Sequence, residues 1–145
     1  MKKTANLECS IDRYTLPLFS YEIIGTFDQP GATWSPAYHA GLDFGAPSGS
    51  LIKAVHSGRI TEASWSGPYG YRTILTLADG TALWYCHQSS MRVRAGQTVA
   101  VGEIIGRVGM TGNAKRPHLH IEVHSADHEA RVDPFKWLEE RGLAP

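Results

Sequence analysis

The sequence lacks an excess of charge of either sign. Its 145 residues include 14 lysines and arginines and 14 aspartates and glutamates, so the formal net charge is zero. Proteins that bind nucleic acids usually carry a basic excess or a basic stripe. The sequence therefore predicts no nucleic-acid partner. Its length suits one compact domain with its own hydrophobic core, which we expect to be a monomer.

Long apolar runs are also missing. No stretch approaches the roughly 18 apolar residues that a membrane-spanning helix needs, so no membrane span is predicted. The chain begins Met1-Lys2-Lys3, but no apolar segment of about 7–15 residues follows, as it would in a secretion signal. Cysteine is scarce, since only Cys9 and Cys86 occur. Two cysteines make neither a disulfide framework nor a zinc ribbon, so we expect two free thiols.

What the sequence does contain is a series of short segments rich in β-branched and aromatic residues, separated by Gly, Asp and Pro. Their composition and length are typical of β-strands. They are residues 51–55, 71–77, 81–85, 97–101, 103–108 and 118–123. Asp79-Gly80 lies between two of them and predicts a two-residue hairpin with a type I′ turn, which needs a positive φ at both positions.

One helix is predicted, at the C-terminus. Asp133 can cap it, Pro134 suits the first helical position, residues 135–141 are good helix formers, and Gly142 ends it. The predicted fold class is therefore all-β, with an antiparallel sheet or sandwich-like single domain, a substrate groove and a short C-terminal helix.

Two histidine patterns point to a metal site. His118 and His120 are two residues apart, and in a strand such side chains lie on one face, about 6.5–7 Å apart. His39 and Asp43 are four residues apart, too far to share a metal in an extended strand, so the backbone must bend between them. Gly41 could adopt the unusual φ of such a bend. Two histidines and one aspartate would leave a fourth tetrahedral position open to water, as in catalytic zinc sites. The alternative is two polar strand faces in water.

Three runs, in this order, resemble the motifs of the lysostaphin and LytM class of peptidases. They are His39-Ala40-Gly41-Leu42-Asp43-Phe44-Gly45-Ala46-Pro47, Trp84-Tyr85-Cys86-His87 and Arg116-Pro117-His118-Leu119-His120-Ile121-Glu122. The resemblance covers about residues 38–142. It implies a catalytic domain over residues 34–145, preceded by an N-terminal arm with a first strand over residues 1–33.

The resemblance also implies a function. The chain would be a zinc-dependent endopeptidase that hydrolyses peptide cross-links of bacterial peptidoglycan, with one zinc ion held by His39, Asp43 and His120. His87 and His118 would be the catalytic imidazoles, and we expect His118 to be the general base because it is nearest to His120. Some members of the class cut glycine bridges and others D-alanyl-diaminopimelate links. The chain would act on the cell wall, and without a secretion signal it would be either a phage-type lysin released by other means or a shortened chain.

Two other functions stay open at this stage. Some relatives of these peptidases have lost metal ligands and activate other wall hydrolases, although all five positions are present here. A phosphocarrier or biotinyl-type carrier domain is suggested by the turn-strand pattern of residues 93–99, but Asp43 and the ordered motifs argue against it. Two residues depart from the family pattern: Arg116 replaces a common glycine, which could alter the groove rim or substrate preference, and Gln88 replaces a leucine.

Several further residues have an expected place. Glu122 shares the parity of His118 and His120, so it either holds a ligand imidazole or is an exposed carboxylate. Cys86 has the parity opposite to His87 and is expected in the core, away from the metal. His56, His124 and His128 are expected at the surface. Trp34, Trp65, Trp84 and Trp137 are expected to be packing residues, although Trp65 and Tyr69 lie in a glycine-rich loop that could border substrate. Tyr38 is expected to be a core or surface aromatic, although it could line the cleft.

Overall fold

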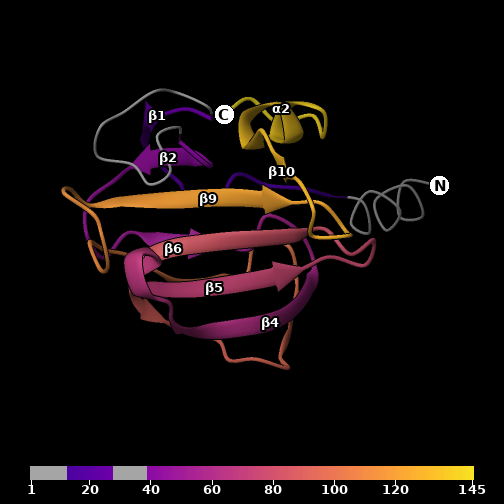
Figure 1. Ribbon diagram of the computed structural model, residues 1–145, viewed down its shortest axis with the longest axis horizontal. Helices are drawn as coiled ribbons and strands as arrows, with labels where there is room; N and C mark the ends of the chain where they lie inside the picture. Colours follow the sequence, from indigo (N-terminus) through magenta and orange to yellow (C-terminus); the bar gives the residue numbers. More distant parts are fainter. Residues whose placement is uncertain (1–12, 28–38) are drawn as a thin grey trace.

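The computed structural model describes residues 13–27 and 39–145, and the regular secondary structure of this part of the chain consists mostly of β-strands (Figure 1). The elements are β1 (Glu22–Gly25), β2 (Leu42–Gly45), β3 (Leu51–Lys53), β4 (Gly58–Trp65), η1 (Gly67–Tyr69), β5 (Tyr71–Thr76), β6 (Ala82–Met91), β7 (Thr98–Val99), β8 (Ile104–Val108), β9 (His118–His124), β10 (Arg131–Val132) and α2 (Pro134–Glu139). Cys9, Trp34 and Tyr38 lie outside the described residues.

The strands form one antiparallel sheet in the order β1-β2-β9-β6-β5-β4-β7. β10 pairs with β9, while β8 pairs with both β3 and the last residues of β6. The predicted all-β class with a short C-terminal helix is confirmed, and each of the six predicted segments overlaps a strand. β4 is not predicted from sequence. Its pairing with β5 shifts between Ile60 and Glu62, and this bulge breaks the alternation on which strand prediction depends.

Strands β9 and β2 separate the core from the functional face by strict alternation. In β9, Leu119, Ile121 and Val123 are buried in the hydrophobic core, and the histidines and the glutamate between them point to the opposite face. In β2, Leu42 and Phe44 are fully buried in the same core. Side chains of a strand alternate between faces, so the polar residues of both strands meet on one side of the sheet.

The hairpin at Asp79-Gly80 exists, but its turn differs from the prediction. The amide of Leu77 donates to the carbonyl of Thr81, so three residues form the loop, and only Gly80 has a positive φ (92°). Asp79 instead accepts a hydrogen bond from the Thr81 amide through Oδ1, at 3.0 Å. This side-chain contact stabilises a three-residue loop with a left-handed glycine in place of the type I′ turn.

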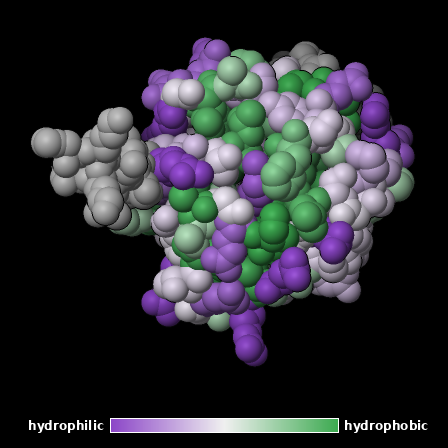
Figure 2. Space-filling view, turned by 180° about the vertical axis from the view of Figure 1, so that it is seen from behind, coloured by the Kyte–Doolittle hydropathy of each residue, from purple (hydrophilic) through white to green (hydrophobic). Residues whose placement is uncertain are grey.

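The C-terminal helix follows its sequence signals. Asp133 is the N-cap and accepts a hydrogen bond from the Phe135 amide at 3.0 Å, while Trp137 and Leu138 are buried against the core. The helix ends at Glu139, two residues before the predicted end, and Gly142 has a positive φ. No helix within residues 13–27 and 39–145 is long and apolar enough to cross a membrane. Seen from behind, the surface mixes hydrophobic residues in its middle with hydrophilic ones at the margin (Figure 2), as is normal for a folded domain.

Candidate metal centre and catalytic site

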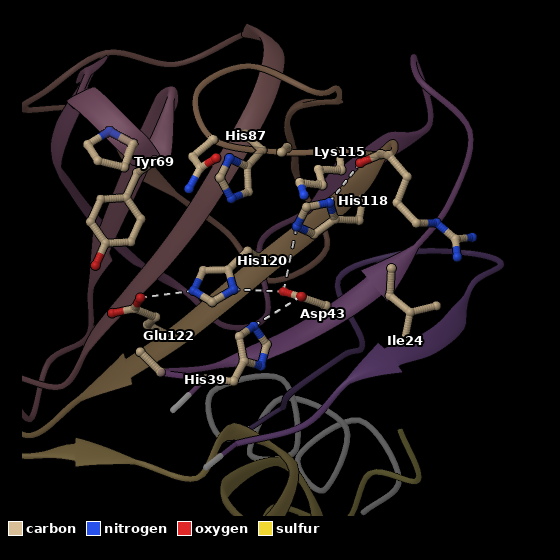
Figure 3. Close-up of a pocket in the computed structure, with 14 residues that line it drawn as sticks. Ile24, His39, Asp43, Tyr69, His87, Lys115, His118, His120 and Glu122 are labelled. Carbon is tan, nitrogen blue, oxygen red and sulfur yellow. Dashed lines mark hydrogen bonds and ion pairs between the residues drawn. The ribbon is translucent and has the colours of Figure 1, made fainter. Parts of the chain in front are cut away.

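The functional face carries a pocket of about 340 Å³. All five residues predicted from sequence line it: His39, Asp43, His87, His118 and His120. The other lining residues are Ile24, Ala40, Pro68, Tyr69, Asn113, Ala114, Lys115, Arg116 and Glu122. The pocket therefore joins side chains from three separate motifs with residues from β1, η1 and the loop before β9 (Figure 3).

The pairing of β2 with β9 brings the predicted ligands together. Asp43 lies directly opposite His120 in the ladder, and His120 Nδ1 is 2.7 Å from Asp43 Oδ1. His39, just before β2, places Nε2 3.0 Å from Asp43 Oδ2. One nitrogen of each imidazole and a carboxylate oxygen all lie within 4.8 Å of one another. Two imidazoles and one carboxylate are the three protein ligands of an open, catalytic zinc site, so this donor set fits the metal.

Gly41 is needed between these ligands for a reason other than the predicted one. It does not have a positive φ. A Cβ at this position would lie 2.1 Å from the carbonyl oxygen of Ile121 and 3.0 Å from Cε1 of His120. The glycine therefore permits a close approach of the bend to β9, and it does so by its missing side chain.

The ring orientation of His39 is set by the backbone. Its Nδ1 is 3.0 Å from the carbonyl oxygen of Thr26. A carbonyl only accepts hydrogen bonds, so Nδ1 carries the proton of the neutral ring. The lone pair of Nε2 then points toward Asp43 and the pocket. This is the outer hydrogen bond typical of a metal-ligating histidine.

His87 and His118 are held in the same way. His87 Nδ1 is 2.7 Å from the carbonyl oxygen of Thr111, and His118 Nδ1 is 2.8 Å from that of Arg116. In the neutral rings both Nε2 atoms are therefore acceptors. The two rings lie side by side with their centroids 4.8 Å apart, and His118 Nε2 is 3.7 Å from Asp43 Oδ1. Two proton acceptors thus adjoin the metal-ligand set.

Glu122 holds the ring of His120, the remaining predicted ligand. Its Oε2 is 2.9 Å from His120 Nε2, and the glutamate is fully buried. Of the two roles left open by the sequence, the exposed carboxylate is excluded, and Glu122 instead anchors the imidazole of His120, a predicted ligand. Burial alone would raise the pKa of Glu122, but hydrogen bonds from His120 and His124 lower it to about 2.

His124 was expected at the surface, and this prediction is wrong. It is buried, its Nε2 is 2.8 Å from Glu122 Oε1, and its ring stacks on Trp84 with centroids 4.0 Å apart. The sequence held a signal for it, because His118, His120, Glu122 and His124 share one parity along β9. His128 is exposed as predicted, whereas His56 is half-buried and stacks on Tyr14.

The electrostatics distinguish the imidazoles. Burial would raise the pKa of Asp43, but hydrogen bonds from His120 and His39 hold it well below its usual range. Burial would lower the pKa of His120, and its two carboxylate partners instead raise it to about 9. Burial lowers the pKa of His87 to about 4, and the neighbouring His118 and His120 add to this effect. His87 is therefore neutral at physiological pH.

A β-bulge positions His87, and it overturns the expectation for Cys86. Along β6, Tyr85 pairs with Thr73 and Gln88 with Tyr71, so β6 advances three residues where β5 advances two. His87 has a φ of 64°, rare for a residue with a side chain. Cys86 lies directly opposite His120 in the ladder and so shares its face, where the bulge also directs His87. Cys86 is fully buried, as expected, but on the site side of the sheet.

The remaining lining residues define two ends of the pocket. Tyr69 lies at the end that contains Glu122, with its ring over His120 at 6.3 Å (Figure 3). Burial, and then the charge of Glu122, raise the pKa of Tyr69 to about 12. Lys115 lies at the other end, beside His118. Trp65, expected to be a packing residue in a loop that could border substrate, is instead 56% exposed, and it is not among the lining residues.

Comparisons with known proteins give a consistent result. Residues 37–134 match the pattern of Peptidase family M23. The chain is 38% identical over 109 residues to lysostaphin of Staphylococcus simulans, covering 72% of this chain and 22% of lysostaphin. It is 39% identical over 90 residues to the DD-carboxypeptidase/endopeptidase Mpg of Neisseria meningitidis serogroup B, covering 62% of this chain and 20% of Mpg. The chain thus spans about a fifth of the length of these relatives.

Solved structures extend the comparison to the fold. The catalytic domain of lysostaphin from Staphylococcus simulans superposes with a TM-score of 0.76 at 33% identity, covering 82% of this chain and 92% of that domain. A zinc-containing peptidase from Vibrio cholerae gives a TM-score of 0.72 at 25% identity, covering 81% of this chain and 37% of that one.

Proposed function

The chain belongs to peptidase family M23, and we propose that it is a zinc-dependent endopeptidase that hydrolyses peptide cross-links of bacterial peptidoglycan. One observation carries the proposal: the complete set of His39, Asp43 and His120 lies beside two further imidazoles that face the same pocket. A site that had lost its activity would not be expected to keep every ligand and both proton acceptors.

His39 Nε2, Asp43 and His120 Nδ1 would hold one zinc ion. When bound, zinc supplies Lewis acidity, which polarises the scissile carbonyl and makes water a stronger acid. The residues around the ligands support this use. Thr26 and Glu122 fix the outer nitrogens of the two histidines, so the ligand atoms are oriented before the metal arrives.

His118 is our candidate for the general base. Its Nε2 is an acceptor, since Nδ1 donates to the carbonyl of Arg116. In this role His118 takes a proton from the attacking water at Nε2, which lies 3.7 Å from Asp43 Oδ1 and so next to the proposed metal ligands. His118 can then return the proton to the leaving amine.

His87 has a different task in this scheme. Burial lowers its pKa to about 4, so it is a weak base at neutral pH. Its Nε2 lone pair faces the pocket, and in this tautomer it accepts a hydrogen bond rather than donating one. We assign to His87 the orientation of the attacking water, by accepting the water hydrogen that is not transferred to His118.

The substrate places the activity at the cell wall, and we propose a monomer whose catalytic domain spans residues 34–145, with residues 1–33 as an N-terminal arm and first strand. The described part of that arm packs on the domain, since Leu18 is buried in the core and Tyr21 lies edge-on against Phe44. Gel filtration of the purified chain tests the oligomeric state.

The function is tested by digestion of purified peptidoglycan. The protein is incubated with sacculi of different cross-link chemistry, and mass spectrometry of the released peptides identifies the new amino and carboxyl ends. We expect cleavage within cross-links, loss of cleavage with a chelator and recovery with added zinc. Asp43→Ala is the matched inactive protein. Stoichiometric zinc without any released ends, on every wall type, would contradict a peptidase and favour a regulator of other wall hydrolases.

A further inference from the structure

Two cationic side chains of the pocket are not used by the scheme above. Lys115 and Arg116 immediately precede Pro117 and His118, line the pocket and are both exposed. Neither side chain makes an ion pair or hydrogen bond with any residue in the described ranges 13–27 and 39–145. Cations that border a pocket and have no counterion in the protein are available to an anionic ligand.

The carboxylates of the pocket do not serve as counterions for these cations. Asp43 is bound by His39 and His120, and Glu122 is bound by His120 and His124. With a divalent cation at the proposed site, the charges of metal and carboxylates cancel. Lys115 and Arg116 then leave the pocket with a positive balance, although the whole chain is neutral.

The backbone ties both cations to the catalytic end of the pocket. The backbone carbonyl of Arg116 accepts a hydrogen bond from His118 Nδ1. The side chain of Arg116 lies over Gly45 of β2, where a Cβ atom would be 3.5 Å from Arg116 Nη2. The loop that carries them is braced, because the amide of Asn113 donates to the carbonyl of Pro68 and Thr111 Oγ1 donates to the carbonyl of Gln88, each at 2.7 Å. Figure 3 shows Lys115 beside His118, opposite the end that holds Tyr69 and Glu122.

From these observations, and resting on the proposed function, we infer that the enzyme selects a cross-link whose residue beside the scissile bond bears a free carboxylate. Lys115 and Arg116 bind that carboxylate, and Arg116 can do so through two parallel N–H donors. An extended peptide advances about 3.3 Å per residue. Cations next to the catalytic imidazole therefore reach one or two residues from the cleaved bond. A neutral oligoglycine bridge offers them no partner.

Three peptides of equal length test the inference. The first contains a D-alanyl-diaminopimelate link with the carboxylate next to the scissile bond free, the second is the same peptide with that carboxylate amidated, and the third is a blocked oligoglycine. We expect kcat/KM for the free acid to exceed that for the amide by about tenfold or more, the effect of one charge-assisted hydrogen bond. Raising the salt concentration should reduce this ratio, because salt screens exposed charges.

The variants Lys115→Gln and Arg116→Gln assign the effect to residues. Each should lower the acid-to-amide ratio several-fold, mainly through KM, and the double variant should bring it close to one. Arg94→Gln removes the same charge from an exposed position outside the pocket and should leave the ratio unchanged. A second readout is the affinity of the uncleaved acid and amide peptides for His118→Ala protein, with and without Lys115→Gln. If Arg116→Gln disturbs His118 and lowers the rates for all peptides equally, the acid-to-amide ratio of Lys115→Gln decides the test.

The outcomes separate the inference from the function on which it rests. Equal cleavage of acid and amide by the parent protein, a ratio unaffected by the double variant, or a preference for oligoglycine would overturn the inference and leave the peptidase intact. Failure to cleave any of the three peptides or any peptidoglycan would instead refute the proposed function.

Discussion

Glu122 offers the most informative perturbation of the site. Its two oxygens accept hydrogen bonds from two buried imidazoles, His120 at 2.9 Å and His124 at 2.8 Å. Glu122→Leu removes both acceptors while keeping a similar volume. Glu122→Gln keeps one carbonyl acceptor, and its amide group can donate to the other ring. The two variants therefore separate the loss of the hydrogen bonds from the loss of the charge.

The expected magnitudes follow from this geometry. A buried donor left without an acceptor costs about 1–3 kcal/mol, so two cost about 2–6 kcal/mol in Glu122→Leu. That is a large part of the roughly 5–15 kcal/mol by which domains are stable. In Glu122→Gln the carbonyl can still hold His120 Nε2, while His124 accepts from the amide group. Loss of such an outer partner typically lowers metal affinity about 10–100-fold. We expect a loss of zinc affinity near the lower end of this range for Glu122→Gln and near the upper end for Glu122→Leu.

Two measurements check these values. Chemical denaturation of the metal-free protein gives the free energy of unfolding, and competition with a chromogenic chelator gives the zinc dissociation constant. Glu103→Gln removes one carboxylate outside the pocket and serves as the control for charge. If Glu122→Leu bound zinc as tightly as the parent protein, Glu122 would not orient His120 and this reasoning would be wrong. If Glu103→Gln lost as much zinc affinity as the Glu122 variants, the loss would reflect a general effect of charge.

Three further predictions concern the ligands and the catalytic pair. Asp43→Ala should lose stoichiometric zinc by elemental analysis, because it removes the one carboxylate between His39 and His120; tightly retained zinc would exclude the proposed site. His118→Ala and His87→Ala should keep zinc yet lose about 10²–10⁴ in rate on wall peptides, and near-native turnover by either would remove its assigned role. The pKa of His87 is lowered in the folded protein to about 4, so the unfolded state binds more protons. The contribution of neutral His87 to the free energy of unfolding is fully present above about pH 6.5, the pKa of an unperturbed imidazole. This contribution is lost as pH falls through about 4. His87→Gln should therefore flatten the acid limb of metal-free stability in denaturant titrations, and an unchanged slope would contradict the burial argument.

The sequence predicts the site well where it depends on strand periodicity. His118 and His120 share a face because side chains alternate along a strand, and the same rule places Glu122 beside them. It also places His124 there, although His124 lies outside the family motifs. Strand parity therefore indicates the position of His124 better than its distance from the motifs does.

Features that break the alternation could not be predicted in this way. The bulge at Cys86 and His87 turns both side chains to one face, whereas strict parity separates them. The composition of residues 81–85 predicts a strand, but nothing in this segment indicates that an extra residue follows it in β6. The register of β6 is set by its partners β5, β8 and β9, and those pairings are long-range. Gly41 is similar, because its role depends on how closely β9 approaches.

Backbone carbonyl groups largely determine which nitrogen of each pocket histidine carries the proton, and such groups are not visible in a sequence motif. Three of the four imidazoles donate through Nδ1 to main-chain carbonyls, those of Thr26, Thr111 and Arg116. A carbonyl is supplied by any residue type, so substitution at these positions leaves the acceptor in place. A change in the length of the loop moves it. The loop between β8 and β9 supplies two of the three acceptors and also carries Lys115. It follows that one loop both sets the tautomers of the proposed catalytic pair and carries the cation that we propose to bind substrate, so an insertion there should alter catalysis and selectivity together.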